Sequence, residues 1–222
     1  MIPPRRANIH WDPAYRIIAT RFPAVDIWAP IEADLWDRLD LIEARTNPRV
    51  AAGHPQDSYI HWPFDNPRPG RFSTSTLGAF YAASSEATAV AETVHYQAIR
   101  CREDQLDPHE FDMRVLSVEI LGAFHDLRGR RADAFPGIRD PHSHAASQAL
   151  AMSLQASGSK GVVFDSVRDS EHAPCVAVWD PATIQRARHL RYLTYRWDGT
   201  SVALAYEKRP LPSGGGVSGL GF

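Results

Sequence analysis

The spacing of apolar residues changes along this chain, and the changes predict helices and strands in mixed order. Over 86–100, apolar residues recur three and four positions apart behind Ser84 and Ser85, so we predict a helix that one of these serines caps. Strict alternation over 113–121 predicts a strand. Similar patterns predict helices over 31–45 and 145–156 and strands over 15–28, 70–73, 77–82, 161–166, 175–179 and 189–197.

The segments between these elements indicate how the chain is organised. Residues 46–70 contain five prolines, and we predict one long loop there, a kind of segment that is usually functional. Residues 1–14 are predicted to form an irregular N-terminal arm, and 201–222 a C-terminal tail that is partly flexible. The elements in 15–200 show no regular strand–helix–strand repeat. We therefore predict a single domain of the α+β class.

The composition of the chain argues against several classes of protein. With 222 residues, 44% of them hydrophobic, and a net charge of −2, the chain can build a core and is not a disordered protein. The balance of 24 basic and 26 acidic residues argues against direct nucleic-acid binding. No apolar run reaches the roughly 18 residues of a membrane span, and the N-terminus lacks a signal-peptide pattern. Because Cys101 and Cys175 form no motif, we expect a cytoplasmic protein.

The sequence contains no common catalytic or phosphate-binding motif, such as the glycine-rich phosphate loop or the GxSxG elbow. His142 and His144, together with Asp140, have the chemistry of metal ligands. A histidine pair two residues apart in a polar segment is more often solvated than metal-bound. We therefore predict no metal site.

Five polar residues remain, because each stands in or beside an apolar element: Arg16, Arg71, Tyr81, Glu92 and Ser166. Each also has a purely structural explanation. The arginines can pair with carboxylates at a sheet edge, the tyrosine can be a half-buried core residue, the glutamate can lie on a solvated helix face, and the serine can cap a turn. Composition and periodicity leave both explanations open for every one of them.

The order and spacing of these residues resemble those of a known protein family. The stretches that carry it are Tyr15-Arg16-Ile17, Gly70-Arg71-Phe72, Ala79-Phe80-Tyr81-Ala82-Ala83, Ala89-Val90-Ala91-Glu92 and Gly161-Val162-Val163-Phe164-Asp165-Ser166-Val167-Arg168. Taken together, this ordered set resembles the RES-domain toxins of RES–Xre toxin–antitoxin systems, which are named for arginine, glutamate and serine.

Further stretches resemble the longer, ParT-like branch of that family. They are Thr20-Arg21-Phe22-Pro23, Thr46-Asn47-Pro48-Arg49, Asp112-Met113-Arg114-Val115-Leu116, Ala146-Ser147-Gln148-Ala149-Leu150 and the run from Cys175 to Trp179. The chain departs from the pattern at Asp165, where many relatives have proline, and at Ala145, where some have a serine. No role is therefore transferred to Ala145.

The resemblance implies an ADP-ribosyltransferase fold of the diphtheria-toxin kind, with NAD+ as substrate. In the ParT-like branch it implies transfer of ADP-ribose to phosphoribosyl pyrophosphate synthetase. The roles implied are diphosphate binding for Arg16 and Arg71, stacking on nicotinamide for Tyr81, stabilisation of the ribosyl cation for Glu92, and a contact with NAD+ for Ser166. The implied partners are a cognate Xre-like antitoxin and a protein acceptor of ADP-ribose.

Three alternatives to the transferase stay open on the sequence. The first is an NAD+ glycohydrolase or phosphorylase that depletes cellular NAD+, since such an enzyme needs the same residues and only water or phosphate as acceptor. The second is a catalytically idle binding module of the same fold, which the presence of both arginines and the glutamate disfavours. The third is a nucleic-acid-binding regulator, for which the sequence offers no basic stripe.

Overall fold

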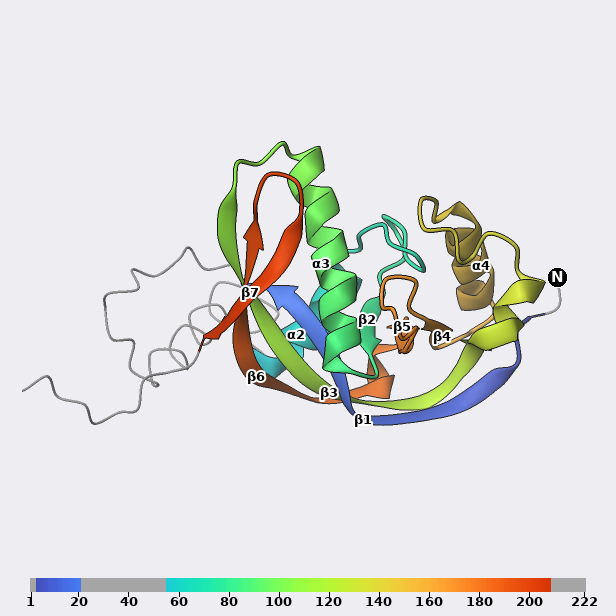
Figure 1. Cartoon of the computed structure of the whole chain (residues 1–222). Helices are drawn as coiled ribbons and strands as arrows, with labels where there is room; N and C mark the ends of the chain where they lie inside the picture. Colours follow the sequence, from blue (N-terminus) through green and yellow to red (C-terminus); the bar gives the residue numbers. More distant parts are fainter. Residues whose placement is uncertain (1–2, 21–54, 209–222) are drawn as a thin grey trace, which may run out of the picture.

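A computed structural model describes residues 3–20 and 55–208 of the chain. Within these ranges, helices and strands alternate irregularly, as expected for an α+β protein (Figure 1). The strands are β1 (Arg6–Ala19), β2 (Phe80–Ala83), β3 (His109–Leu127), β4 (Gly161–Asp165), β5 (Pro174–Val178), β6 (Ile184–Trp197) and β7 (Val202–Lys208). The helices are α2 (Pro55–Asp65), α3 (Glu86–Glu103) and α4 (Ala145–Ala156), with short 3-10 turns η2 (Gly129–Ala134) and η3 (Pro181–Thr183).

The strands form one seven-stranded sheet in the order β1-β2-β5-β4-β3-β6-β7, and β1 pairs with β3 as well as with β2. The pairings β1-β2-β5-β4-β3 therefore close into a ring, although only Tyr15 and Ala83 join β1 to β2. Strand β3 is long enough to pair with β1 along one edge and with β6 and then β4 along the other. The sheet is strongly curved as a result (Figure 1).

The two faces of the sheet are covered by different helices. One cluster of buried residues joins the sheet to α3 and α4, through side chains such as Ala98 and Leu154. The other cluster lies on the opposite face, where Ile60 of α2 packs with residues of β1 to β6. Since strand residues alternate between faces, neighbours in one strand belong to different clusters: Phe80 lies in the second, and Tyr81 packs against the first.

Most predicted elements are confirmed, and two of them closely. Ser85 caps α3 by accepting a hydrogen bond from the Thr88 N–H at 3.1 Å, and α4 has the predicted bounds, Ala145–Ala156. The strands predicted over 77–82, 113–121, 161–166, 175–179 and 189–197 correspond to β2, β3, β4, β5 and β6. The helix predicted over 31–45 lies outside the described residues.

Four predictions differ from the structure. Strand β1 begins at Arg6, inside the predicted N-terminal arm, because its backbone pairs with β3 from His125 onwards. Helix α2 occupies part of the predicted loop 46–70 and keeps Pro63 in its last turn. Residues 70–73 form an isolated bridge rather than a strand, and β7 lies within the predicted tail, where it extends the sheet beside β6. For β1, α2 and β7, pairing or packing with another segment outweighs local proline or glycine content, whereas the bridge at 70–73 joins residues only three apart.

None of the described helices combines the length and the apolar character needed to span a membrane.

Gly161, at the start of β4, tests how tightly the ring is closed. A Cβ at this position would lie 2.2 Å from the Ala177 carbonyl oxygen, and φ is +151°. We expect Gly161→Ala to lower the free energy of unfolding by about 3 kcal/mol, because the clash adds to an unfavourable backbone conformation. Urea denaturation measures this. Gly129→Ala is the control: its φ is +55°, but nothing lies within 4 Å of the added Cβ, so it isolates the backbone cost. Equal losses in both variants would contradict the predicted clash.

Candidate active site

One face of α3 contacts the segment that follows β4. Thr88 and Glu92 are four residues apart on this face, and His95 follows after three more, so all three point the same way. The Thr88 hydroxyl donates a hydrogen bond to Asp169 Oδ2 at 2.8 Å. Glu92 Oε1 lies 2.5 Å from the Ser166 hydroxyl. Two side-chain bonds therefore fix this segment against the helix.

The Ser166 hydroxyl is fully buried, and its three hydrogen bonds settle which way its proton points. Its oxygen accepts the backbone N–H groups of Arg168 at 3.1 Å and Asp169 at 3.0 Å. The proton is therefore donated to Glu92 Oε1, which acts as the acceptor. Ser166 thus holds the Glu92 carboxylate in one orientation. Its oxygen closes the local turn, and its hydroxyl proton remains available for Glu92.

Arg71 is buried, and its guanidinium is held by backbone carbonyl oxygens rather than by a carboxylate. Nη1 donates to the carbonyl oxygens of Ile138 at 2.8 Å and Asp140 at 3.0 Å. Burial lowers the pKa of Arg71, and the nearby charge of Glu92 opposes that shift. The charges of Arg71 and Glu92 therefore act on each other, although no ion pair within 4 Å joins them among the described residues.

Tyr81, in β2, fixes the turn that carries Arg71. Its hydroxyl accepts the Phe72 N–H at 2.8 Å and donates to Ser73 Oγ at 3.0 Å. Burial raises the pKa of Tyr81 to about 12, so the phenol stays protonated at neutral pH. Gly70 makes this approach possible, because a Cβ there would lie 3.0 Å from the Tyr81 hydroxyl oxygen and 2.8 Å from Ser73 Oγ.

Arg16 lies apart from the other predicted residues. Its guanidinium stacks on Phe80 at 4.4 Å from the ring centroid, on the face of the sheet opposite to Tyr81. Nη1 donates a hydrogen bond to the Tyr81 carbonyl oxygen at 2.9 Å. Burial lowers the pKa of Arg16 to about 10, which leaves it protonated at neutral pH. The structure thus connects Arg16 to the backbone of Tyr81 and places Arg71, Tyr81, Glu92 and Ser166 on the other face.

Arg168 belongs to the same group, although sequence reasoning gave it no role. Its Nη2 donates to the Pro141 carbonyl oxygen at 2.6 Å, so one loop anchors both Arg168 and Arg71 through its carbonyl groups. Its charge contributes to the lowered pKa values of Arg71, His95 and His144. Its position two residues after Ser166 was visible in the sequence, but nothing there showed that it would face Arg71.

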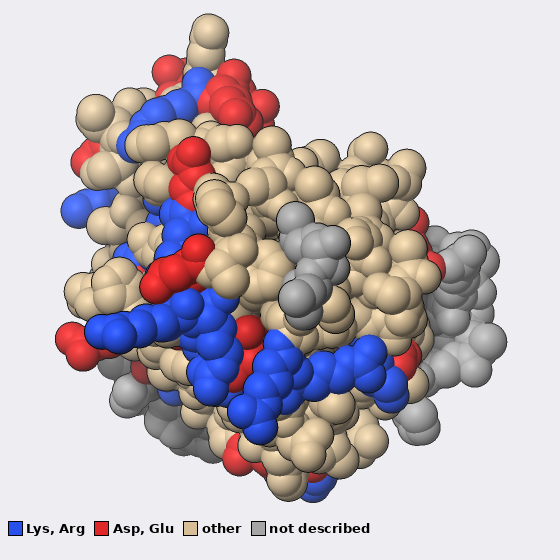
Figure 2. Space-filling model, turned by 90° about the vertical axis from the view of Figure 1, so that its right-hand side faces the viewer, with Lys and Arg blue, Asp and Glu red and all other residues tan. Residues whose placement is uncertain are grey.

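The positive charge of this site is not compensated by carboxylates in direct contact. Among the described residues, neither Arg71 nor Arg168 forms an ion pair. The band of basic side chains in Figure 2 lies on the side of the molecule that carries η2, where Arg128 and Arg131 both pair with Asp126 and Arg139 pairs with Asp133. A guanidinium group held by carbonyl oxygens keeps its charge and its remaining N–H donors, so Arg71 and Arg168 have the chemistry to bind an anion.

The loop that anchors the arginines does not gather metal ligands. The Asp140 carboxylate accepts the N–H groups of His142 at 2.8 Å and Ser143 at 3.1 Å, which lowers its pKa and closes a turn. The described residues contain no group of three or more histidine, cysteine, aspartate or glutamate side chains that could hold a metal ion.

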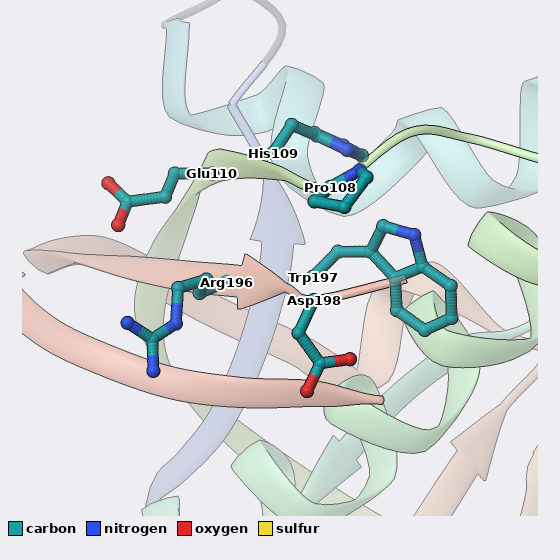
Figure 3. A pocket seen from close by; sticks show the side chains of 6 residues that line it. All are labelled: Pro108, His109, Glu110, Arg196, Trp197 and Asp198. Atoms are coloured by element: carbon teal, nitrogen blue, oxygen red, sulfur yellow. The ribbon is translucent and has the colours of Figure 1, made fainter. Parts of the chain in front are cut away.

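An open pocket elsewhere on the molecule contains none of these residues. Figure 3 shows its lining, where β3 begins and β6 ends: Pro108, His109, Glu110, Arg196, Trp197 and Asp198. Trp197 Nε1 is already bonded to the Leu106 carbonyl oxygen at 2.8 Å. The Asp198 carboxylate of this pocket is used locally, since its Oδ1 accepts the N–H groups of Thr200 and Ser201 at 2.8 Å each. The pocket contains none of the residues singled out in the sequence, so the candidate site is the one around Glu92.

Comparisons with known proteins can now be set beside this geometry. A family model described as the RES domain matches residues 47–198, a range that includes Arg71, Tyr81, Glu92, Ser166 and Arg168. The uncharacterized protein y4oC of Sinorhizobium fredii is 28% identical over 210 residues, which cover 88% of this chain and 87% of that protein. The crystal structure of the M. tuberculosis MbcT–MbcA toxin–antitoxin complex matches with a TM-score of 0.48 and 14% identity, over 82% of this chain and 86% of that chain.

Asp169 ties the segment after β4 to α3, and this tie is expected to depend on pH. The hydrogen bond from Thr88 lowers the pKa of Asp169 below its ordinary value. The stabilisation is therefore complete above the unfolded pKa, near 3.9 for a model aspartate, and is lost as the pH falls through the lower folded pKa. We expect Asp169→Asn to lower the urea midpoint most at pH 6–7, and the difference from the wild type to shrink below about pH 4. Asp107→Asn, on the exposed loop before β3, is the control; a pH-independent difference for Asp169→Asn would contradict the prediction.

Proposed function

The chain belongs to the RES-domain family, and on that premise we propose that it is an NAD+-dependent mono-ADP-ribosyltransferase acting as the toxin of a toxin–antitoxin module. The observation that carries the proposal is the Glu92 carboxylate, held at 2.5 Å by Ser166 beside the uncompensated charges of Arg71 and Arg168. NAD+ has the matching chemistry, since it contains a diphosphate and a ribose whose C1′ bears a positively charged nicotinamide ring.

The arginines would bind the diphosphate of NAD+. A guanidinium presents several N–H donors in one plane, and donors not used on a carbonyl oxygen are free to meet phosphate oxygens. The contacts of Arg71 with Ile138 and Asp140, and of Arg168 with Pro141, fix the two side chains before the substrate arrives. This preorganisation reduces the entropy that binding would otherwise cost.

Glu92 would act on the ribose. As the bond between C1′ of the ribose and the nicotinamide nitrogen breaks, its electron pair stays on that nitrogen, and neutral nicotinamide leaves. The positive charge moves onto the ribose, where a nearby carboxylate stabilises it. A nucleophile of the acceptor protein then adds to C1′ and gives up its proton. Ser166 supports this step as a positioning residue, because its hydrogen bond fixes the carboxylate that faces the developing charge.

Two further roles follow from the contacts of Tyr81 and Arg16. The Tyr81 hydroxyl is hydrogen-bonded to the Phe72 N–H and to Ser73 Oγ, and these bonds orient the ring. Stacking of the ring on nicotinamide stays a prediction. Arg16 supports the Tyr81 backbone from the other face of the sheet, so we assign it the positioning of β2. Its direct contact with NAD+, and that of Ser166, also remain predictions.

The partners implied by the family complete the proposal. A toxin that consumes NAD+ requires an antitoxin, here Xre-like, and a transferase requires a protein acceptor, for which phosphoribosyl pyrophosphate synthetase is the first candidate. The proposed reaction takes place in the cytoplasm, where NAD+ and the acceptor are available. Hydrolysis or phosphorolysis of NAD+ would use the same site residues, with water or phosphate in place of the acceptor protein.

Replacing the carboxylate tests the proposal directly. We expect Glu92→Gln to lower nicotinamide release from NAD+ by about 10²–10³, because the neutral amide cannot stabilise the ribosyl cation as well as a carboxylate. Glu103→Gln is the matched control, since Glu103 is an exposed residue of the same helix and lies outside the site. Mass spectrometry of the purified protein with NAD+ and bacterial lysate measures free nicotinamide and ADP-ribose adducts together.

The products of that experiment separate the candidate activities. Nicotinamide release with a discrete adduct on one lysate protein supports transfer. Release with free ADP-ribose or ADP-ribose 1-phosphate as the product replaces transfer with NAD+ degradation. Wild-type release by Glu92→Gln, or no NAD+ loss with the folded wild-type protein, would refute the proposed catalytic role.

A further inference from the structure

His95 lies one helical turn beyond Glu92 on the face of α3 that meets the site, and the reaction proposed above does not use it. Its Nε2 is buried and has no hydrogen-bond partner among the described residues. A buried polar atom without a partner is destabilising, so native proteins rarely keep one without a ligand or a functional reason. The position of His95 therefore needs a partner that the described part of the chain does not supply.

The charges around His95 indicate what kind of partner fits. Burial lowers the pKa of His95 below its ordinary value, and the positive charges of Arg168, Arg102, Arg71 and His144 add to this effect. At neutral pH the ring is uncharged and carries one N–H donor. Glu92, one helical turn before His95, is bonded to Ser166, and Asp140 Oδ1 closes its own turn. Positive charge therefore predominates around the His95 ring.

We propose that His95 is a third ligand of the diphosphate subsite, donating a hydrogen bond from Nε2 to a phosphate oxygen held by Arg71 and Arg168. The inference rests on the proposed function for NAD+ as the carrier of that diphosphate, but the anion site itself is defined by residues of this chain. An anion at this position offsets the positive charges that add to burial in lowering the pKa of His95. Binding is therefore accompanied by proton uptake, because the phosphate charge favours the imidazolium form.

Two variants separate the hydrogen bond from the titration. His95→Ala removes both, and we expect it to weaken binding of inorganic pyrophosphate about tenfold. His95→Gln keeps an N–H donor but cannot titrate, so we expect it to retain more affinity and to lose proton uptake. His109→Gln is the control, because His109 is exposed at the start of β3 and lines the pocket of Figure 3 instead.

Isothermal titration calorimetry of the full chain with magnesium-free pyrophosphate at pH 7.5, in two buffers of different ionisation enthalpy, measures affinity and proton uptake together. Urea midpoints equal to that of the wild type show that each variant is folded. His144 shares the same arginine neighbours, so its titration is followed by NMR beside that of His95. We expect the pH midpoint of the His95 titration to be higher when pyrophosphate is bound.

The outcomes distinguish this inference from the proposed function. Wild-type pyrophosphate affinity in His95→Ala, or no binding by the wild-type protein, overturns the inference. Proton uptake that persists in His95→Gln, or a midpoint of His95 that does not move, overturns it as well. His95-dependent pyrophosphate binding without any NAD+ cleavage supports the anion site and removes the proposed reaction, whereas NAD+ cleavage with His95-independent binding does the reverse.

Discussion

The hydrogen bond between Ser166 and Glu92 connects the two halves of the candidate site. It crosses from α3 to the segment after β4, and the hydrogen bond between Thr88 and Asp169 is the second side-chain bond that joins this helix and loop. Ser166 can make this bond because the N–H groups of Arg168 and Asp169 occupy its acceptor positions. The same turn that orients the carboxylate also brings Arg168 to face Arg71. One buried hydroxyl thus sets the relation between the acidic and the basic parts of the site.

The basic part is built on a different principle. Arg71 and Arg168 are held by carbonyl oxygens, which fix a guanidinium group without neutralising it. A carboxylate partner would have fixed them as well, but it would also have competed with an anionic ligand for the same donors. Arg128, just before η2, and Arg131, within it, show the contrast, since both pair with Asp126. This difference between compensated and uncompensated arginines separates a stabilising cluster from a binding site.

The sequence predicted those elements whose structure depends on interactions between neighbouring residues. The serine cap and apolar stripe of α3, the bounds of α4 and the buried run of β4 depend mainly on neighbouring residues, and the structure confirms them. Strand β1 and the bridge at Gly70 depend instead on partners a hundred residues away or on the approach of Tyr81, which periodicity does not contain. Arg71, Tyr81, Glu92 and Ser166 were singled out in sequence with the help of the family pattern. Arg168 and His95 were not, because only the fold shows which charges face them.

The closure of the sheet by β1 has a consequence for when the site forms. Strand β1 is synthesised before the other described strands, yet it pairs with β3, which begins about a hundred residues later, and with β2, whose other neighbour is β5. Such distant pairings are slow to form, because chain entropy is lost before the contacts stabilise the structure. The ring is complete only once Val178 at the end of β5 is available. A ribosome-bound chain that stops before Val178 lacks part of the scaffold, so the arrangement of Glu92 and the arginines can form only after β5 has been synthesised.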